Sequence, residues 1–168
     1  AALWGGAGGT RAVVVTSNDA GYDAALALNA VGTHVAAILD PREAHQSAAV
    51  VAVEAAGLKI KFGSGGAGVT GSRKVTGVLA TSMGSSGKAG DRIACDVAAM
   101  SGGFSPFVQL WSHCGGKLRW NDTAHHFAPA PDKPPTDGAG AGFVIPAGDA
   151  SGATTLAEVI GSARAAGA

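Results

Sequence analysis

A strand–helix–strand segment near the start of the chain constrains the fold more than any other feature. Residues 12–16 form a continuous apolar run, a helix is expected from Asn18 or Asp19 to about Ala30, and a second apolar run covers residues 34–40. Apolar strands on either side of a helix are typical of a parallel sheet that is buried on both faces. The segment therefore predicts a β-α-β unit of the kind that binds dinucleotides.

The glycines of such a unit are only partly present. The fingerprint G-x-G-x-x-G falls on Thr16, Asn18 and Gly21, so the third glycine alone is kept. Asp40 follows Gly21 by about 20 residues, where the fold places the acid that binds an adenosine ribose. We interpret Asp40, Asn18 and Gly21 as candidate cofactor-binding residues with a weakened hold on phosphate, because side chains at Thr16 and Asn18 occupy the space of the approaching pyrophosphate. The alternative, which the missing glycines favour, is a vestigial site in which Asp40 is a solvated acid capping the next helix. Arg42 alone does not indicate a 2′-phosphate.

The rest of the pattern predicts a two-part layout. The expected elements are a helix over 41–56, a strand over 58–62, a glycine-rich loop over 63–72, strands over 74–83 and 91–100, a helix over 106–112, a strand over 142–146 and a helix over 154–166. The pair at 74–83 and 91–100 is an antiparallel meander, and the end of its second strand is expected to enter the parallel sheet. The predicted class is α/β: a Rossmann-like, three-layer domain with a parallel sheet, helices and an antiparallel β-meander.

Composition excludes several classes of function. The 168 residues carry 12 basic and 12 acidic side chains, so bulk charge attracts neither nucleic acid nor an anionic membrane. No apolar run reaches the roughly 18 residues that span a bilayer, and no secretory signal is visible, so we expect a cytoplasmic protein. The first residues carry neither Met nor a helix cap, which we interpret as a cut into a longer chain. Cys95 and Cys114 are expected to be reduced, inert thiols.

Two motifs in the right order carry a family resemblance. Residues 95–120 contain Asp96, then S-G-G-F-S-P at 101–106, L-W at 110–111 and G-G-K-L-R at 115–119. A T-x-N-D-x-x-Y motif precedes them, at Thr16, Asn18, Asp19 and Tyr22. Together these resemble the α subunit of heterotetrameric sarcosine oxidase, and the resemblance covers about residues 10–166.

The resemblance implies a role within a larger flavoenzyme. In that family the complex demethylates sarcosine oxidatively with FAD, FMN and a tightly bound NAD, and the amine is oxidised at a flavin of another subunit. Residues 10–127 would be an inserted nicotinamide-binding-type domain, 128–168 the end of the outer FAD/NAD-binding domain, and 1–9 a linker. The expected partners are the other subunits, and this chain would supply no catalytic residue.

The same resemblance moves the preferred cofactor site to the far end of the chain. Gly148-Asp149 lies between an expected strand and an expected helix, where the acid contacts a ribose or ribityl hydroxyl and the helix amides face the pyrophosphate. Gly148, Asp149, Thr154, Thr155 and Leu156 would thus line an NAD site. The alternative is an ordinary helix start, since Ser151, Thr154 and Thr155 all cap well.

Other interpretations remain open at this point. One is a subunit of a related complex, such as an opine oxidase, a cyanide synthase or a dye-linked proline dehydrogenase. Another is an NAD(P)H-dependent flavin reductase, and a third is an interaction module without a cofactor. His113, Cys114, His125 and His126 lack the spacing of a common zinc site, so no metal site is expected.

Overall fold

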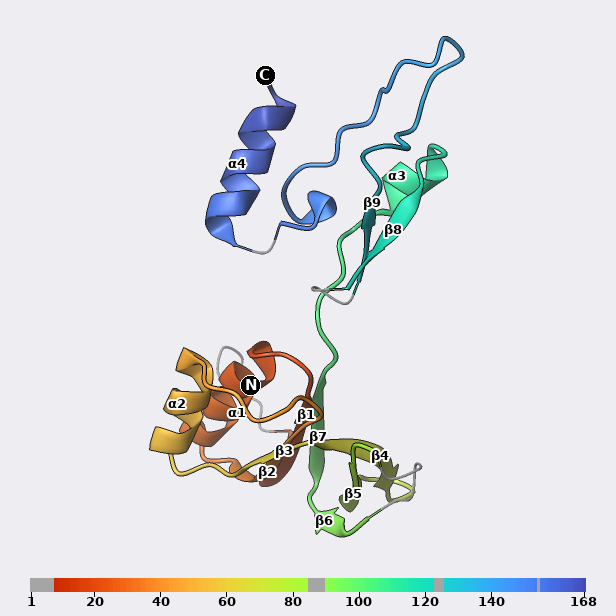
Figure 1. Cartoon of the computed structure of the whole chain (residues 1–168). Coiled ribbons are helices and arrows are strands. Elements are labelled where there is room, and N and C mark those ends of the chain that lie inside the picture. The colour runs from red at the N-terminus through yellow and green to blue at the C-terminus, as the bar shows by residue number, and fades with distance from the viewer. Residues whose placement is uncertain (1–7, 85–89, 123–125, 154) are drawn as a thin grey trace. The chain divides into compact units, whose positions relative to one another are not determined.

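A computed structural model describes residues 8–84, 90–122, 126–153 and 155–168 (Figure 1). The chain divides into two compact units, Ala1–Gly103 and Phe104–Ala168. The expected boundary between residues 127 and 128 separates an inserted from an outer domain, and it stays a prediction. Each unit is described by itself.

The first unit is built on a four-stranded parallel sheet. Its order is β3-β2-β1-β7, with β1 at Arg11–Thr16, β2 at His34–Asp40, β3 at Ile60–Phe62 and β7 at Val97–Ser101. Helix α1 (Ala20–Ala30) connects β1 to β2, and α2 (Ala48–Ala55) connects β2 to β3. Val13 is aligned with Ala37 of β2 and with Ala98 of β7. The predicted β-α-β unit and the return of the later strand to this sheet are therefore both present.

An antiparallel sheet forms the third layer of the first unit. It comprises β4 (Ser64–Thr70), β5 (Gly77–Ser82) and β6 (Arg92–Ala94) in sequence order. Helices α1 and α2 lie on one side of the parallel sheet, and β4, β5 and β6 lie on the other (Figure 1). The expected α/β class with three layers is thus confirmed.

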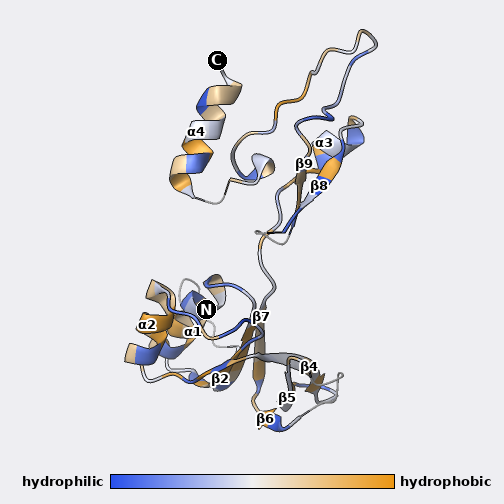
Figure 2. Cartoon of the chain, in the orientation of Figure 1, coloured by the Kyte–Doolittle hydropathy of each residue, from blue (hydrophilic) through white to orange (hydrophobic). Residues whose placement is uncertain are grey.

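Alternating residues of the central strands divide the core between these layers. Val14 and Ile38 pack with Val50 and Val53 of α2, whereas Val13, on the opposite face, belongs to a cluster that includes Val78 of β5. Successive strand residues point to opposite faces, which is why an unbroken apolar run is needed here. Figure 2 shows this apolar interior along β2, β7 and α2.

The second unit has less regular structure. It contains α3 (Gln109–His113), a hairpin of β8 (Leu118–Asn121) and β9 (His126–Pro129), a 3₁₀ turn at Gly148–Ser151, here called η1, and α4 (Leu156–Ala166). Trp111 of α3 is buried, and its indole Nε1 donates to the Lys117 carbonyl at 2.8 Å. This bond anchors α3 against the start of β8.

Several expected elements differ from the structure, and one observed element was not expected. Helix α2 begins at Ala48 rather than at Pro41, because the Ser47 side chain caps it by accepting from the Val50 amide. The glycine-rich segment expected as a loop forms β4, and the β8–β9 hairpin was not expected at all. The strand expected over 142–146 is limited to a single bridge between Thr136 and Gly142. In the described part of the chain, no other strand pairs with that segment.

Candidate cofactor site

The carboxyl ends of three parallel strands bring the first set of predicted residues together. Strands β1, β2 and β7 end at Thr16, Asp40 and Ser101, at one edge of the sheet. Ligands of doubly wound folds bind outside this edge, where the chain crosses from one strand to a helix. A hollow of about 120 Å³ lies there, lined by Val15, Thr16, Ser17, Pro41, Gly65, Met100, Ser101 and Gly102.

The two residues that replace fingerprint glycines hydrogen-bond within the chain. Thr16 Oγ1 donates to the Asn18 carbonyl at 2.6 Å and accepts from the Asn18 amide at 3.1 Å. Asn18 Nδ2 donates to the Ser101 carbonyl, and Asn18 Oδ1 accepts from the Ser101 hydroxyl, both at 3.1 Å. These side chains therefore tie the β1–α1 turn to the end of β7.

Gly21 is required by close packing of α1 on β1. A Cβ atom placed on Gly21 would lie 2.2 Å from both Cβ and Oγ1 of Thr16. This is the role of the third fingerprint glycine, which lets the helix approach the strand. The structure thus gives Gly21 a packing role at the predicted position, and its contact with a cofactor stays a prediction.

Asp40 is fully buried and surrounded by donors. Its carboxylate accepts from the Tyr22 hydroxyl at 2.5 Å, from the Arg42 amide at 2.8 Å, and from the Arg42 guanidinium through Nη2 at 2.8 Å and Nε at 3.1 Å. Burial raises the pKa of Asp40, but the bonds from Arg42 and Tyr22 outweigh it and hold that pKa below its ordinary value of 3.8. The carboxylate is therefore ionised and paired.

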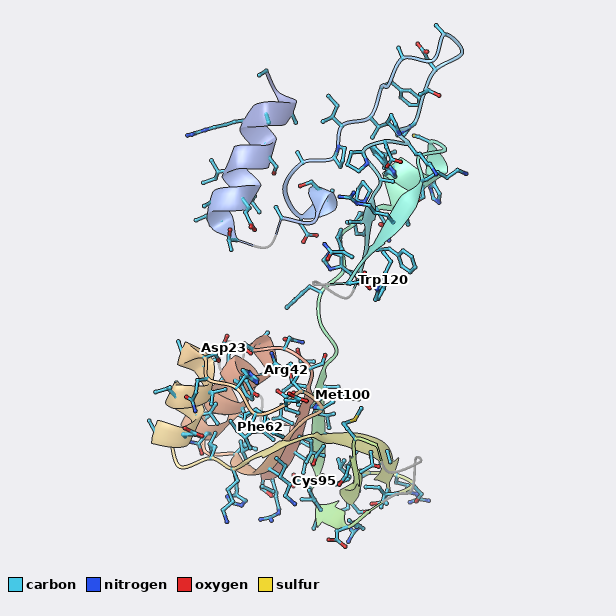
Figure 3. All side chains as sticks on the ribbon, viewed as in Figure 1. Asp23, Arg42, Phe62, Cys95, Met100 and Trp120 are labelled. Atoms are coloured by element: carbon cyan, nitrogen blue, oxygen red, sulfur yellow. The ribbon has the colours of Figure 1, made fainter. Side chains whose placement is uncertain are left out.

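Asp19 is a second acid that pairs with the Arg42 guanidinium. Arg42 Nη2 lies 2.9 Å from Asp19 Oδ1, and the Arg42 guanidinium carbon lies 5.7 Å from the centre of the Tyr22 ring. Figure 3 shows Arg42 beside α1 at the carboxyl edge of the sheet. Sequence reasoning weighed Arg42 only as a partner for a 2′-phosphate and missed this cluster. The signal for an ion pair between Asp40 and Arg42 was their spacing of two residues along the chain.

The second set of predicted residues lies in the second unit. Gly148 has a φ of 61° and begins η1, and its amide donates to the Ser162 hydroxyl of α4 at 2.9 Å. Asp149 is exposed, and among the described residues no partner hydrogen-bonds to its carboxylate. Its environment is thus the opposite of that of Asp40, and its oxygens are accessible to a ligand hydroxyl.

The start of α4 is capped by its own residues. Thr155 and Glu158 form a capping box, in which Thr155 Oγ1 accepts from the Glu158 amide and the Glu158 carboxylate accepts from the Thr155 amide. Of the expected cofactor-binding amides, that of Leu156 lies between these two, and the Leu156 side chain is exposed. Thr154 lies outside the described residues.

The predicted site residues therefore form two groups. Asn18, Gly21 and Asp40 lie at the sheet edge of the first unit, and η1 contacts α4 in the second.

Cys95 and Cys114 are free thiols, and burial and then the charge of Asp96 raise the pKa of Cys95. Among the described residues no three His, Cys, Asp or Glu side chains gather as metal ligands do, and His125 lies outside them. Within the same residues, no helix has the length and apolarity to cross a membrane.

Solved structures of two reductases share the fold of this chain. Thioredoxin reductase of T. acidophilum has a TM-score of 0.62 to this chain at 19% identity, over 90% of this chain and 48% of that one. The bacillithiol disulfide reductase of Staphylococcus aureus has a TM-score of 0.53 at 18% identity, over 72% and 36% of the two chains. At such identities the likeness shows the fold alone, which is a Rossmann-like α/β fold with a parallel sheet, helices and antiparallel strands.

Sequence comparison identifies the relatives. Sarcosine oxidase α subunits of two Corynebacterium strains, P-1 and U-96, are 35% and 36% identical over 72% and 73% of this chain. The α subunit of Rhizobium meliloti is 32% identical over 96% of it. The chain spans only 13 to 15% of the length of these relatives. No family profile matches the chain. The expected resemblance is confirmed: the chain is related to one section of the α subunit of sarcosine oxidase.

Proposed function

We propose that this chain is a nucleotide-holding and structural part of the α subunit of a flavoenzyme that oxidatively demethylates sarcosine. The names of its relatives, sarcosine oxidase subunit alpha, support both parts of this proposal: membership of a multi-subunit enzyme, and sarcosine as the substrate of that enzyme. In this proposal the whole complex acts on the CH–NH group of sarcosine with FAD and FMN, and its other subunits are the partners of this chain. The chain alone is inactive.

The proposed NAD site lies at Asp149, and the exposure of that carboxylate is the observation that carries it. An ionised carboxylate accepts hydrogen bonds only, so it suits the two hydroxyls of a ribose. The capping box at Thr155 and Glu158 leaves the amides of Leu156 and Ala157 between its two members as the ones that could face a phosphate. The residues thus fit the ribose of NAD better than its pyrophosphate.

The chemistry assigned to this chain is binding rather than catalysis. A bound nicotinamide ring can accept a hydride, but the family resemblance assigns amine oxidation to a flavin on another subunit. Asp149 would orient the ribose, and Gly148 would keep the turn that presents Asp149, since its positive φ disfavours any residue with a Cβ.

The experiment is NAD retention in the purified complex. Denaturation of the complex should release NAD, which mass spectrometry then quantifies. Asp149→Ala should lower the amount of released NAD more than Asp40→Ala does. Asp132→Ala removes another exposed acid of the second unit and serves as the matched control. Equal retention in Asp149→Ala and the control, or a larger loss in Asp40→Ala, would contradict the assigned site.

An interaction module without a cofactor is the second candidate. The saturated carboxylate of Asp40 favours it for the first unit, because a buried acid with every acceptor position taken leaves nothing for a ribose. The same measurement separates the two: a complex that assembles but releases no NAD supports the module.

A further inference from the structure

We propose that Arg42 closes the nucleotide edge of the first unit by acting as a built-in ligand of Asp40. The guanidinium would donate to the carboxylate in place of the ribose hydroxyls that donate to it in nucleotide-binding proteins of this fold. This inference concerns a different place from the proposed NAD site at Asp149, and it does not depend on that site.

The first argument is the number of acceptor positions on Asp40. A carboxylate has about four lone-pair positions. Oδ1 accepts from the Arg42 amide at 2.8 Å and from Arg42 Nε at 3.1 Å. Oδ2 accepts from the Tyr22 hydroxyl at 2.5 Å and from Arg42 Nη2 at 2.8 Å. All four positions are taken, and the side chain has no exposed surface.

The second argument is that Arg42 is itself held in place. Asp19 pairs with Nη2 at 2.9 Å, and the guanidinium lies near the Tyr22 ring, with its carbon 5.7 Å from the ring centre. Asp19 and Tyr22 are both members of the T-x-N-D-x-x-Y motif. That motif therefore supplies two of the contacts of Arg42, and a ligand would have to displace all of them.

The third argument concerns the phosphate side of the same edge. The first turn of α1 carries the carboxylate of Asp23, and Asp19 precedes it, so the positive end of the helix already faces two negative charges. The Asn18 side chain accepts from the Ala20 amide at 3.1 Å and is bound to Ser101. A pyrophosphate would meet like charge and find an amide already in use.

The class of excluded ligand follows from these contacts. Adenosine-containing dinucleotides need both an acid for the ribose and amides for the pyrophosphate. Arg42 blocks the first requirement, whereas Asn18 and Asp19 block the second. Removing the guanidinium should therefore restore ribose binding but not phosphate binding, so adenosine without phosphate is the appropriate probe.

The test is an NMR titration of the chain with adenosine. The unchanged chain should show no saturable shift of the amides of Tyr22 and Asp40. Arg42→Ala should show saturable shifts there and bind adenosine at least about tenfold more tightly, a difference of about 1.4 kcal/mol. Adding Asp40→Asn to Arg42→Ala should abolish the gain, because the acceptor charge is lost.

A second variant tests the proposal in case Arg42→Ala does not fold. Arg42→Lys keeps the positive charge but cannot fork across both carboxylate oxygens, so it should bind adenosine with an affinity between those of the unchanged chain and Arg42→Ala. The proposal is wrong if the unchanged chain shows saturable shifts at Asp40. It is equally wrong if neither folded variant binds adenosine more tightly than the unchanged chain.

Discussion

The buried charge pair of Asp40 and Arg42 makes the stability of the first unit depend on pH. The pKa of Asp40 is held below 3.8, and that of Asp19 is lowered too, because hydrogen bonds from Ser47 and Arg42 outweigh its desolvation. A carboxyl whose pKa is lower in the folded state stabilises the fold above its unfolded pKa, and this contribution is lost as the pH falls through the folded pKa. We therefore expect the free energy of unfolding to decrease below about pH 4.

Urea unfolding between pH 7 and pH 3 measures this dependence. Asp40→Asn should be less stable than the unchanged chain at pH 7, by about 3 kcal/mol, because it leaves the Arg42 charge without its main partner. It should also show a smaller decrease with acid. Asp132→Asn, at an exposed acid, is the control and should keep the original pH dependence. Parallel curves for the Asp40→Asn variant and the unchanged chain would contradict the pairing.

Gly21 offers a test of packing at a single position. Gly21→Ala should destabilise the first unit by about 2 kcal/mol, because the new methyl group overlaps Thr16 and must push α1 away from β1. Gly161→Ala, inside α4 where a Cβ meets no atom within 4 Å, should instead be neutral or stabilising by up to about 1 kcal/mol. Circular dichroism during urea unfolding compares both. Equal changes in the free energy of unfolding for the two substitutions would contradict the role of Gly21 in the close approach of α1 to β1.

The sequence was informative about residue positions and uninformative about their partners. The fingerprint spacing located Gly21 correctly at the start of helix α1 and Asp40 at the end of strand β2. It could not show that Asp40 is buried under Arg42, because that depends on how residues 41–46 leave β2 before α2 begins. Local spacing gives proximity along the chain, whereas the choice between a ligand and a neighbouring guanidinium is made by tertiary packing.

At the scale of elements, the G-G-K-L-R motif covers the turn that follows α3 and the start of β8. A Cβ on Gly116 would lie 2.4 Å from Nε1 of Trp111, the buried indole that donates to the Lys117 carbonyl. Gly116→Ala should displace the indole and destabilise the second unit by about 2 kcal/mol. Tryptophan fluorescence during urea unfolding reports this. Gly138→Ala, with open space at its Cβ, is the control, and an equal effect there would contradict the contact.

Asp96 joins the amino ends of two neighbouring strands. Its carboxylate accepts from the Thr10 and Arg11 amides at 2.9 and 2.7 Å and from the Thr10 hydroxyl at 2.9 Å. These bonds, those from the two amides first, lower the pKa of Asp96 to about 2. Asp96→Asn should lower the Tm of the first unit at pH 7 and speed hydrogen exchange at the start of β1. Asp91→Asn, at an exposed acid before β6, is the control.

Elements were predictable where the apolar pattern was long. Strands β1 and β2 and helix α1 agree with their predicted ranges within two residues, because continuous burial leaves a clear pattern. Strand β4 was missed because its glycines carry no apolar signal and it is ordered by pairing with β5. The segment 142–146 has a strand's composition, yet extended backbone needs a partner strand to form a sheet.

On the scale of the whole molecule, apolar burial is concentrated in the first unit. Thirteen of the 16 buried hydrophobic residues among those described precede Gly103, and the second unit contributes Trp111, Ala128 and Ala130. The second unit also exposes ten of the large hydrophobic side chains: Phe104, Phe107, Leu110, Leu118, Trp120, Phe127, Phe143, Ile145, Leu156 and Ile160. Since burial of apolar surface is the main stabilising contribution, the second unit should be the less stable one.

The chain by itself should therefore unfold in two transitions. Tryptophan fluorescence of a Trp4→Phe variant reports only Trp111 and Trp120, both in the second unit, whereas amide exchange along β1 and β2 reports the first. We expect the fluorescence midpoint at a lower urea concentration than the midpoint for the β1 and β2 amides, and each transition should have the smaller m-value of a unit shorter than the chain. Coincident midpoints with one m-value for the full length would mean that the two units unfold as one cooperative domain.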